Sequence, residues 1–246
     1  MKDLTIIIPA YNEEKRIGNT LEEYIKFFKD KLGNNFEIMV ILNGCKDDTL
    51  NVVKKYDVKF KNIKEAIGKG GAIIEGFKIA EGKFIGFVDA DNATPPWAFY
   101  DLYKNINDKD GIIASRWIKG AKIGKKQSFS RRFASRGFNI LVRLFFDIGV
   151  NDTQCGAKLF RKEAVKKVVN KLGITSWGFD IDLLYLMKRN GFKVIEIATE
   201  WNEPGESHLN IKKTSYEMFL SVIRLRLIYS PFKIIVKIYD KVFGDG

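Results

Sequence analysis

Apolar residues in the first half of the chain fall alternately into short continuous runs and into longer stretches with helical spacing. The runs cover residues 5–8, 36–42 and 84–88, and their length is that of buried strands. Between the first two runs, apolar residues recur every three or four positions, which predicts an amphipathic helix over about residues 13–32. The chain is therefore expected to begin with a strand, a helix and a second strand.

The same alternation continues as far as residue 116. A second helix is expected to begin at residues 47–49, and a third at the glycine-rich residues 68–71. Short strands are expected at residues 58–60 and 111–115. Strands that alternate with helices predict an α/β fold, in which a doubly wound and mostly parallel sheet is flanked by helices.

The second half of the chain follows a different pattern. The elements expected there are a basic loop over 119–127, a basic and apolar helix over about 130–146, a strand at 157–160, and helices from about 162 and over 179–189. From Thr214 the chain is strongly apolar and helical, and Pro231 starts a last helix with Ser230 as its cap. We therefore divide the chain into a main domain over residues 1–213 and C-terminal amphipathic helices over residues 214–246.

The last of these helices has a narrow polar stripe and a wide apolar face. Its stripe consists of Lys233, Lys237, Asp240 and Lys241. A helix with this pattern packs either on the core of its own domain or in a membrane interface, where lysines meet anionic headgroups. The pattern leaves both interpretations open.

The composition limits the classes of partner and of chemistry. The formal net charge is +12, which indicates an acidic partner such as nucleic acid, an anionic membrane or a phosphorylated ligand. The two cysteines are far apart, so neither a disulfide framework nor a thiolate zinc site is expected. The first apolar run is too short for a signal peptide, and no continuous apolar stretch approaches the roughly 20 residues of a spanning helix.

Two carboxylates stand one residue apart at the end of a buried run. Asp89, Ala90 and Asp91 follow residues 84–88, at the tip of a predicted parallel strand, where open α/β sheets bind ligands. Carboxylate oxygens at such a place suit Mg²⁺ or Mn²⁺ that also holds a diphosphate. The alternative is an acidic turn that caps the next helix.

Other polar and glycine-containing segments also follow predicted strands. Lys69 lies between glycines at a predicted helix N-terminus, where a cation and bare backbone suit a diphosphate, although the spacing is not that of a P-loop. Asn43 ends the second strand. The segment after the first strand consists of Pro9, Ala10, Tyr11, Asn12, Glu13 and Glu14. These segments are expected to meet at one edge of the sheet.

In this order the motifs resemble those of the family 2 glycosyltransferases, specifically the polyprenyl-phosphate sugar transferases. The matching segments are 8–14, 68–70, 88–91, 115–116, 131–135, 152–160, 177–184 and 223–226. The likeness covers about residues 4–229. It implies the glycosyltransferase A-type fold, with residues 1–213 as its catalytic domain. It also implies inverting, metal-dependent transfer of a hexose from a nucleoside-diphosphate sugar to a polyprenyl phosphate such as dolichyl phosphate.

Asn92, Ala93 and Thr94 are more similar to the dolichyl-phosphate glucosyltransferases than to the mannosyltransferases, which usually carry Gln in place of Ala93. The resemblance thus favours UDP-glucose over GDP-mannose as donor. Asn43 departs from the pattern, because relatives often have an Asp there that contacts the nucleoside. A sugar-1-phosphate nucleotidyltransferase is the alternative of another class. It usually needs a Gly- and Arg-rich loop after the first strand, which this chain lacks.

The resemblance also implies roles for single residues. Asp91 and Asp89 would hold Mg²⁺ or Mn²⁺, and Lys69 would stabilise the diphosphate. Arg116, Arg131 and Ser135 would hold the acceptor phosphate, because guanidinium groups bind phosphate oxygens in bidentate fashion. The residues expected to bind the donor are Pro9, Ala10, Tyr11, Asn12, Glu13, Asn43, Lys69, Asp89, Ala90 and Asp91. The residues expected to act in catalysis are Asp89, Asp91, Arg116, Arg131, Ser135 and Asp152.

Asp152, Asp180 and Asp182 are candidates either for contacts with sugar hydroxyls or for structural capping. Cys155 is expected to be a small buried residue. The chain lacks the long transmembrane hairpins of many bacterial homologues, so we expect peripheral attachment to the cytoplasmic face of a membrane. No nucleic-acid-binding module is recognisable, and no nucleic acid partner is expected.

Overall fold

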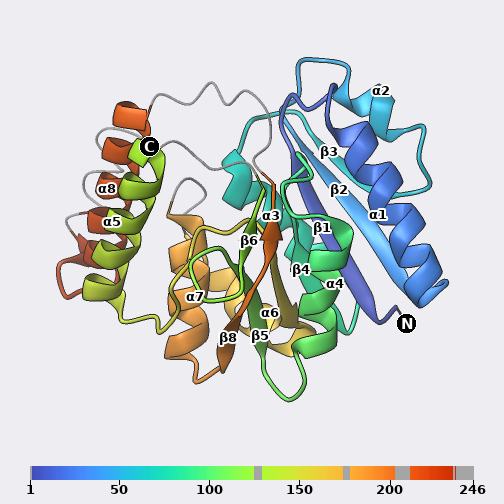
Figure 1. Cartoon of the computed structure of the whole chain (residues 1–246). Coiled ribbons are helices and arrows are strands. Elements are labelled where there is room, and N and C mark those ends of the chain that lie inside the picture. Colours follow the sequence, from blue (N-terminus) through green and yellow to red (C-terminus); the bar gives the residue numbers. More distant parts are fainter. Residues whose placement is uncertain (1, 125–128, 174–177, 203–210, 235, 237–246) are drawn as a thin grey trace.

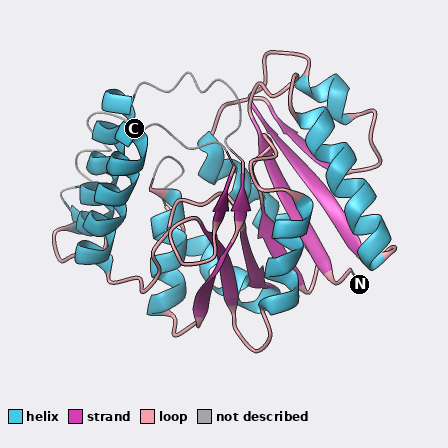
Figure 2. Cartoon of the chain, viewed as in Figure 1, coloured by secondary structure: helices cyan, strands magenta, loops and turns pink. Residues whose placement is uncertain are grey.

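A computed structural model shows a twisted central sheet with helices on both faces (Figures 1 and 2). The structure describes all residues except 1, 125–128, 174–177, 203–210, 235 and 237–246, and of residues 129–135 and 211–215 it describes the backbone alone. Seven strands form the sheet in the order β3-β2-β1-β4-β7-β5-β8. They are β1 (Leu4–Ala10), β2 (Phe36–Asn43), β3 (Lys59–Ile63), β4 (Phe84–Phe87), β5 (Gly111–Ser115), β7 (Lys158–Arg161) and β8 (Val194–Ala198).

Both faces of the central strands are buried, which explains their continuous apolar runs. In β1, Ile6 and Ile8 pack on one face with the helices α1 (Ile17–Leu32) and α4 (Pro96–Asn105). Ile7, between them, packs on the other face with α3, α6 and α7. The bounds of these three helices are Gly68–Ile79, Lys162–Val168 and Phe179–Arg189. The sheet is therefore covered on both sides, as the alternation of strands and helices predicts.

The mostly parallel sheet is confirmed, with one exception. Strands β3, β2, β1 and β4 are mutually parallel, as are β5 and β8. Strand β7 runs antiparallel to both β4 and β5, a direction that the sequence pattern left open. The chain leaves β5 at its carboxyl end and enters β7 on the same side of the sheet, so the two neighbouring strands run in opposite directions.

Several smaller elements differ from the sequence-based prediction. Strand β8 was not predicted, because Glu196 interrupts its apolar residues at the half-buried edge of the sheet. Helix α1 begins at Ile17 rather than near residue 13, since a turn over Glu13–Arg16 precedes it. A second sheet of two strands, β6 (Lys122–Ile123) and β9 (Glu200–Trp201), and the short helices α2 (Thr49–Val53) and η1 (Val169–Lys171) complete this part.

Two long helices lie side by side at one end of the molecule, away from β1 (Figure 1). They are α5 (Phe129–Phe146) and α8 (Ile211–Ile228), and they reach the core through Val142, Phe146, Val222 and Leu225. Helix α5 lies within the predicted catalytic domain, whereas α8 spans the predicted boundary between residues 213 and 214. The division of the chain at this boundary stays a prediction. Within the described part of the chain, no helix is both long enough and apolar enough to cross a membrane.

Candidate active site

A cavity of about 360 Å³ opens at the carboxyl ends of β1, β2 and β4. Parallel strands end at the same edge of a sheet, so residues far apart in the sequence meet there. The cavity contains every residue predicted to bind the donor except Asn12, and it adds Ala66 and Gly68. Its lining consists of Pro9, Ala10, Tyr11, Glu13, Asn43, Ala66, Gly68, Lys69, Asp89, Ala90 and Asp91.

Asn12 instead ties together two of the loops that form the wall of the cavity. Its Oδ1 accepts a hydrogen bond of 2.8 Å from the backbone N–H of Lys46, and its φ of 53° lies in the left-handed region that Asn tolerates. Nearby, the backbone N–H of Glu13 donates to Oγ1 of Thr49 over 2.8 Å. The loops after β1 and β2 are thus held together by side chains that cap each other's backbone.

Lys69 and Asp89 form an ion pair on the floor of the cavity. Burial by itself would raise the pKa of Asp89, but the ammonium of Lys69 outweighs burial and lowers it. Burial likewise works against the charge on Lys69, whereas Asp89 and Asp180 raise its pKa above the ordinary value. The floor of the cavity therefore carries a fixed cation at the N-terminus of α3, where free backbone N–H groups also attract anions.

Asp91 faces the same cavity in a different electrostatic state. Burial, and then the negative charge of Asp89, raise the pKa of Asp91 to about 6. One oxygen of Asp91, Oδ1, accepts a hydrogen bond of 3.0 Å from the backbone N–H of Ala93. Two neighbouring carboxylates that disfavour each other's charge are suited to share a divalent cation.

The residues present fit a magnesium or manganese ion that is shared with a ligand. Among the described residues there is no group of three or more His, Cys, Asp or Glu side chains that could hold a metal alone. One or two carboxylates that act together with substrate phosphates are, however, the usual protein contribution to a Mg²⁺ site. Asp89 and Asp91 would therefore hold the metal only in company with an oxygen-rich ligand in the cavity.

The loop that carries the two aspartates is fixed from two sides, which the sequence alone did not reveal. On one side, the hydroxyls of Thr20 and Tyr24 in α1 donate hydrogen bonds of 2.7 Å to the carbonyls of Ala90 and Thr94. On the other side, the backbone N–H of Asn202 donates to the carbonyl of Ala93 over 2.8 Å. The signal for the first side was present in the sequence, since Thr20 and Tyr24 are hydroxyl-bearing residues at core positions of the helix.

Arg116 and Asp152 form a second, fully paired unit at the end of β5. Nε and Nη2 of Arg116 donate to Oδ2 and Oδ1 of Asp152 over 2.8 and 2.9 Å. The backbone N–H of Arg116 donates to the same Oδ2 over 2.9 Å. Although burial lowers the pKa of Arg116, Asp152 outweighs it and raises that pKa. Asp152 is thus placed to orient Arg116, and its contact with a sugar hydroxyl stays a prediction.

Aromatic rings surround this guanidinium. Its central carbon lies 5.8 Å from the ring centroid of Trp117 and 5.4 Å from that of Trp201. The guanidinium of Arg136, in α5, lies 5.3 Å from the ring of Trp117. Helix α5 therefore reaches the Arg116 site. The side chains of Arg131 and Ser135, in the first part of that helix, lie outside the described residues, and their roles stay predictions.

The remaining acidic candidates are engaged with other parts of the protein. Asp180 accepts a hydrogen bond of 2.5 Å from the fully buried Nζ of Lys158. Asp182 accepts bonds from the backbone N–H of Gly173 over 3.0 Å and from the hydroxyl of Tyr229 over 2.5 Å. These contacts are structural ties. The prediction that Cys155 is buried is confirmed, since none of its surface is exposed.

Comparison with known proteins identifies relatives of most of the chain. The model of the family "Glycosyl transferase family 2" matches residues 5–169. A dolichyl-phosphate beta-glucosyltransferase of Dictyostelium discoideum is 33% identical over 92% of this chain and 74% of its own length. The one named ALG5D in Trichomonas vaginalis is 36% identical, over 92% of this chain and 73% of its own. The human enzyme named dolichyl-phosphate beta-glucosyltransferase is 31% identical, over 93% of this chain and 76% of its own length.

Among solved structures, the chain is similar to glucosyl-3-phosphoglycerate synthase of Mycobacterium tuberculosis, crystallised with UDP. The TM-score is 0.68 at 16% identity, over 94% of this chain and 82% of that one. Mannosyl-3-phosphoglycerate synthase of Rubrobacter xylanophilus gives a TM-score of 0.67, also at 16% identity, over 92% of this chain and 74% of that one. These similarities confirm the predicted glycosyltransferase A-type fold.

Proposed function

We propose that this chain, which belongs to glycosyl transferase family 2, transfers glucose from UDP-glucose to dolichyl phosphate or a similar polyprenyl phosphate. The printed names of its curated relatives support the glucosyl donor and the lipid phosphate acceptor. The observation that carries the proposal is the cavity at the end of β1 and β4, which combines Lys69 with the Asp89/Asp91 pair. A cation beside two carboxylates suits a nucleoside diphosphate and its metal.

Each side of the site has a task in this reaction. Lys69 and the N-terminus of α3 bind the diphosphate, and Asp91 with Asp89 would hold Mg²⁺ or Mn²⁺. A bound divalent metal offsets the charge that develops on the leaving diphosphate. The likeness to a synthase crystallised with Mn²⁺ and UDP supports such a metal. The preferred ion is either Mg²⁺ or Mn²⁺.

The acceptor side needs positioning rather than a strong base. A phosphate monoester is already anionic at neutral pH, so its oxygen attacks the anomeric carbon while the bond to the diphosphate oxygen breaks. This single displacement inverts the anomeric configuration. Arg116, oriented by Asp152, binds the attacking phosphate, and Arg131 and Ser135 from α5 complete that site. Holding two anions in line supplies catalysis through orientation and electrostatics.

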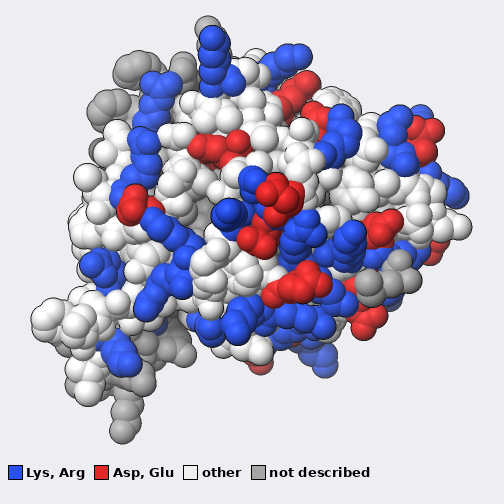
Figure 3. All heavy atoms as spheres, turned by 90° about the horizontal axis from the view of Figure 1, so that it is seen from below, with Lys and Arg blue, Asp and Glu red and all other residues white. Residues whose placement is uncertain are grey.

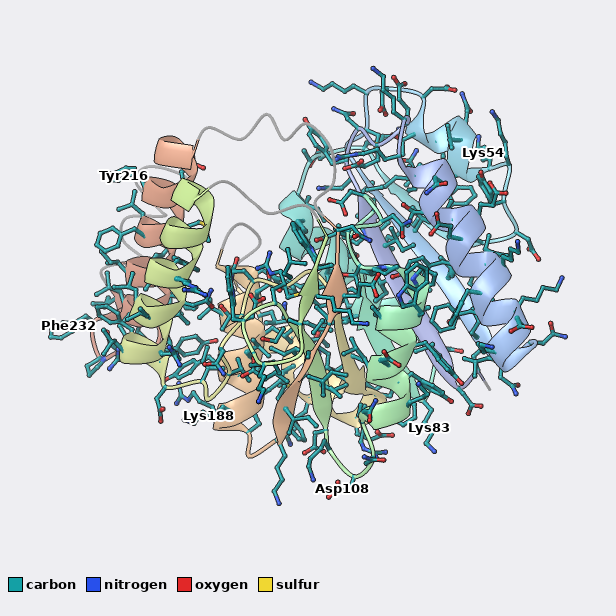
Figure 4. All side chains as sticks on the ribbon, viewed as in Figure 1. Lys54, Lys83, Asp108, Lys188, Tyr216 and Phe232 are labelled. Atoms are coloured by element: carbon teal, nitrogen blue, oxygen red, sulfur yellow. The ribbon has the colours of Figure 1, made fainter. Side chains whose placement is uncertain are left out.

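We further propose that α5 and α8 attach the protein to the cytoplasmic face of a membrane. Leu144 is 78% exposed, and Tyr216 and Phe232 point away from the sheet on the outer side of the helix pair (Figure 4). The exposed large apolar residues of α5, of α8 and of the segment that follows α8 are Ile140, Leu144, Phe145, Tyr216, Phe219, Leu220, Ile223, Phe232 and Ile234. Large apolar side chains exposed along a helix pair suit a lipid interface.

The distribution of charge supports a membrane rather than a nucleic acid. On the face seen in Figure 3, Lys and Arg side chains are spread among Asp and Glu side chains, and do not form one continuous stripe. Exposed cations also accompany these apolar residues, at Arg136 and Arg143 in α5, Arg226 in α8 and Lys233 in the segment after α8. Basic residues beside an apolar surface suit anionic headgroups. The predicted last helix lies largely outside the described residues.

The proposed function is tested by incubating the protein with labelled UDP-glucose or GDP-mannose, dolichyl phosphate and Mg²⁺ or Mn²⁺, and then extracting the lipid. Label is expected in the lipid only with UDP-glucose and only when the lipid phosphate is present. Asp91→Asn, which keeps the size of the side chain, is expected to lower the rate by about a hundred-fold or more. Label from GDP-mannose, or full activity in EDTA, would contradict the proposed donor or the metal.

A further inference from the structure

Gly156 lies directly against the carboxylate of Asp89. A β-carbon built on Gly156 would overlap Oδ2 of Asp89 and would lie only 2.5 Å from its Cγ and 3.0 Å from its Oδ1. The three atoms nearest to this missing side chain thus all belong to the Asp89 carboxylate. The space that a side chain at position 156 would need is filled by a group that the proposed function places in the donor site.

The sheet explains why these two residues meet. In the antiparallel pair of β4 and β7, Phe87 lies opposite Lys158. Continuing this register by two residues, beyond the ends of both strands, brings Asp89 opposite Gly156. Glycine near a strand often marks a close approach of another group to the backbone. Gly156 is not among the glycines with positive φ, so space rather than backbone conformation excludes a side chain there.

The backbone on both sides of Gly156 is pinned. The carbonyl of Cys155 accepts a hydrogen bond of 2.6 Å from the buried Nζ of Lys158. The carbonyl of Ala157 accepts one of 3.0 Å from the backbone N–H of Ala114, and neither Cys155 nor Ala157 has any exposed surface. A side chain at position 156 therefore displaces the Asp89 carboxylate more readily than it displaces its own backbone.

We propose that Gly156 is a positioning residue of the donor site, which lets the Asp89 carboxylate lie directly against the neighbouring chain and pair with Lys69. This inference rests on the proposed function, because it takes the cavity as the donor site. It assigns a role in donor binding to a residue that does not line the cavity. Any larger residue at position 156 moves Asp89 away from its pairing with Lys69 and toward the ligand.

The first test measures binding of UDP in the presence of Mn²⁺ by calorimetry, on the full chain. Gly156→Ala is expected to weaken binding at least ten-fold. The matched control is Gly173→Ala, because an added β-carbon there meets no atom within 4 Å and φ is ordinary. This control is expected to bind like the wild type. Unchanged binding by Gly156→Ala would overturn the proposal.

The second test is a double-mutant cycle in thermal stability, which needs no ligand. Gly156→Ala is expected to lower Tm by roughly 2–10 °C in the wild type, as overpacking does. In the Asp89→Ala background the same substitution is expected to cost much less, because the overlapping carboxylate is gone. An equal loss in both backgrounds would refute the coupling. A wild-type protein that binds no UDP would refute the proposed function, while the cycle would still decide whether Gly156 positions Asp89.

Discussion

Replacing Asp152 by Asn should destabilise the protein and disable the acceptor side of the site. Asp152 is completely buried, and both its oxygens accept hydrogen bonds from Arg116, whose side chain is only 13% exposed. Asn keeps one acceptor oxygen, but it turns an NH₂ group toward a guanidinium that can only donate. Breaking a buried ion pair by removing one partner costs about 3–5 kcal/mol, since the other charge stays buried without compensation.

The expected loss lies at the lower end of this range, about 3 kcal/mol, because an Asn oxygen in the place of Oδ2 keeps the hydrogen bonds from the backbone N–H and from Nε of Arg116. Urea unfolding followed by tryptophan fluorescence measures the loss, which corresponds to more than a hundred-fold change in the unfolding equilibrium. Turnover should fall as well, because Arg116 no longer has a fixed orientation.

The double variant Arg116→Met, Asp152→Asn separates stability from function. Met removes the buried charge and fills similar space, while the Asn oxygen still accepts the backbone N–H of residue 116. The double variant should therefore be more stable than Asp152→Asn alone, yet it should stay inactive. A loss below about 1 kcal/mol for Asp152→Asn would refute the reasoning on burial, and an active double variant would refute the role of Arg116.

Three further predictions concern other parts of the molecule. Tyr24→Phe removes the hydroxyl that holds the loop after Asp89–Asp91 and should cost about 1–3 kcal/mol in urea unfolding, with weaker binding of UDP; wild-type values for both would contradict the anchoring. Burial raises the pKa of Cys155 to about 11, so at pH 8 only roughly a thousandth of it is thiolate. A thiol reagent should therefore modify Cys45 alone until the protein is denatured. Two rapidly reacting thiols in the native protein would disprove this. Leu144→Glu should reduce co-sedimentation with anionic vesicles without lowering Tm. The control Ile79→Glu, which places the same charge on α3, should leave co-sedimentation unchanged. Equal sedimentation of both variants would argue against a membrane face on α5.

Much of the fold was predictable because it depends on local periodicity. The runs at β1, β2 and β4 are continuous and apolar because both faces of these strands are buried, and helix α1 shows its buried stripe at intervals of three and four. Strand β8 was missed because it lies at an edge and is interrupted by Glu196. The direction of β7 could not be predicted, because strand direction depends on where a long connection returns, which no local pattern reveals.

For the candidate site, the sequence by itself determined which chemical groups stand at the ends of the strands. Asp89 and Asp91 follow an apolar run, and Lys69 opens a helix. In a parallel sheet these positions necessarily share one edge. The likeness to glycosyl transferase family 2 could be recognised for the same reason, since its motifs are short and lie in a fixed order along the chain.

Only the tertiary structure decided which of these groups engage each other. The pairing of Arg116 with Asp152, the hydrogen bonds from Thr20 and Tyr24 to the aspartate loop, and the contact between Gly156 and Asp89 all join distant segments. Such contacts depend on strand direction and on the packing of helices against the sheet. A sequence pattern shows that a residue is polar or small, but the fold determines which partner that residue contacts.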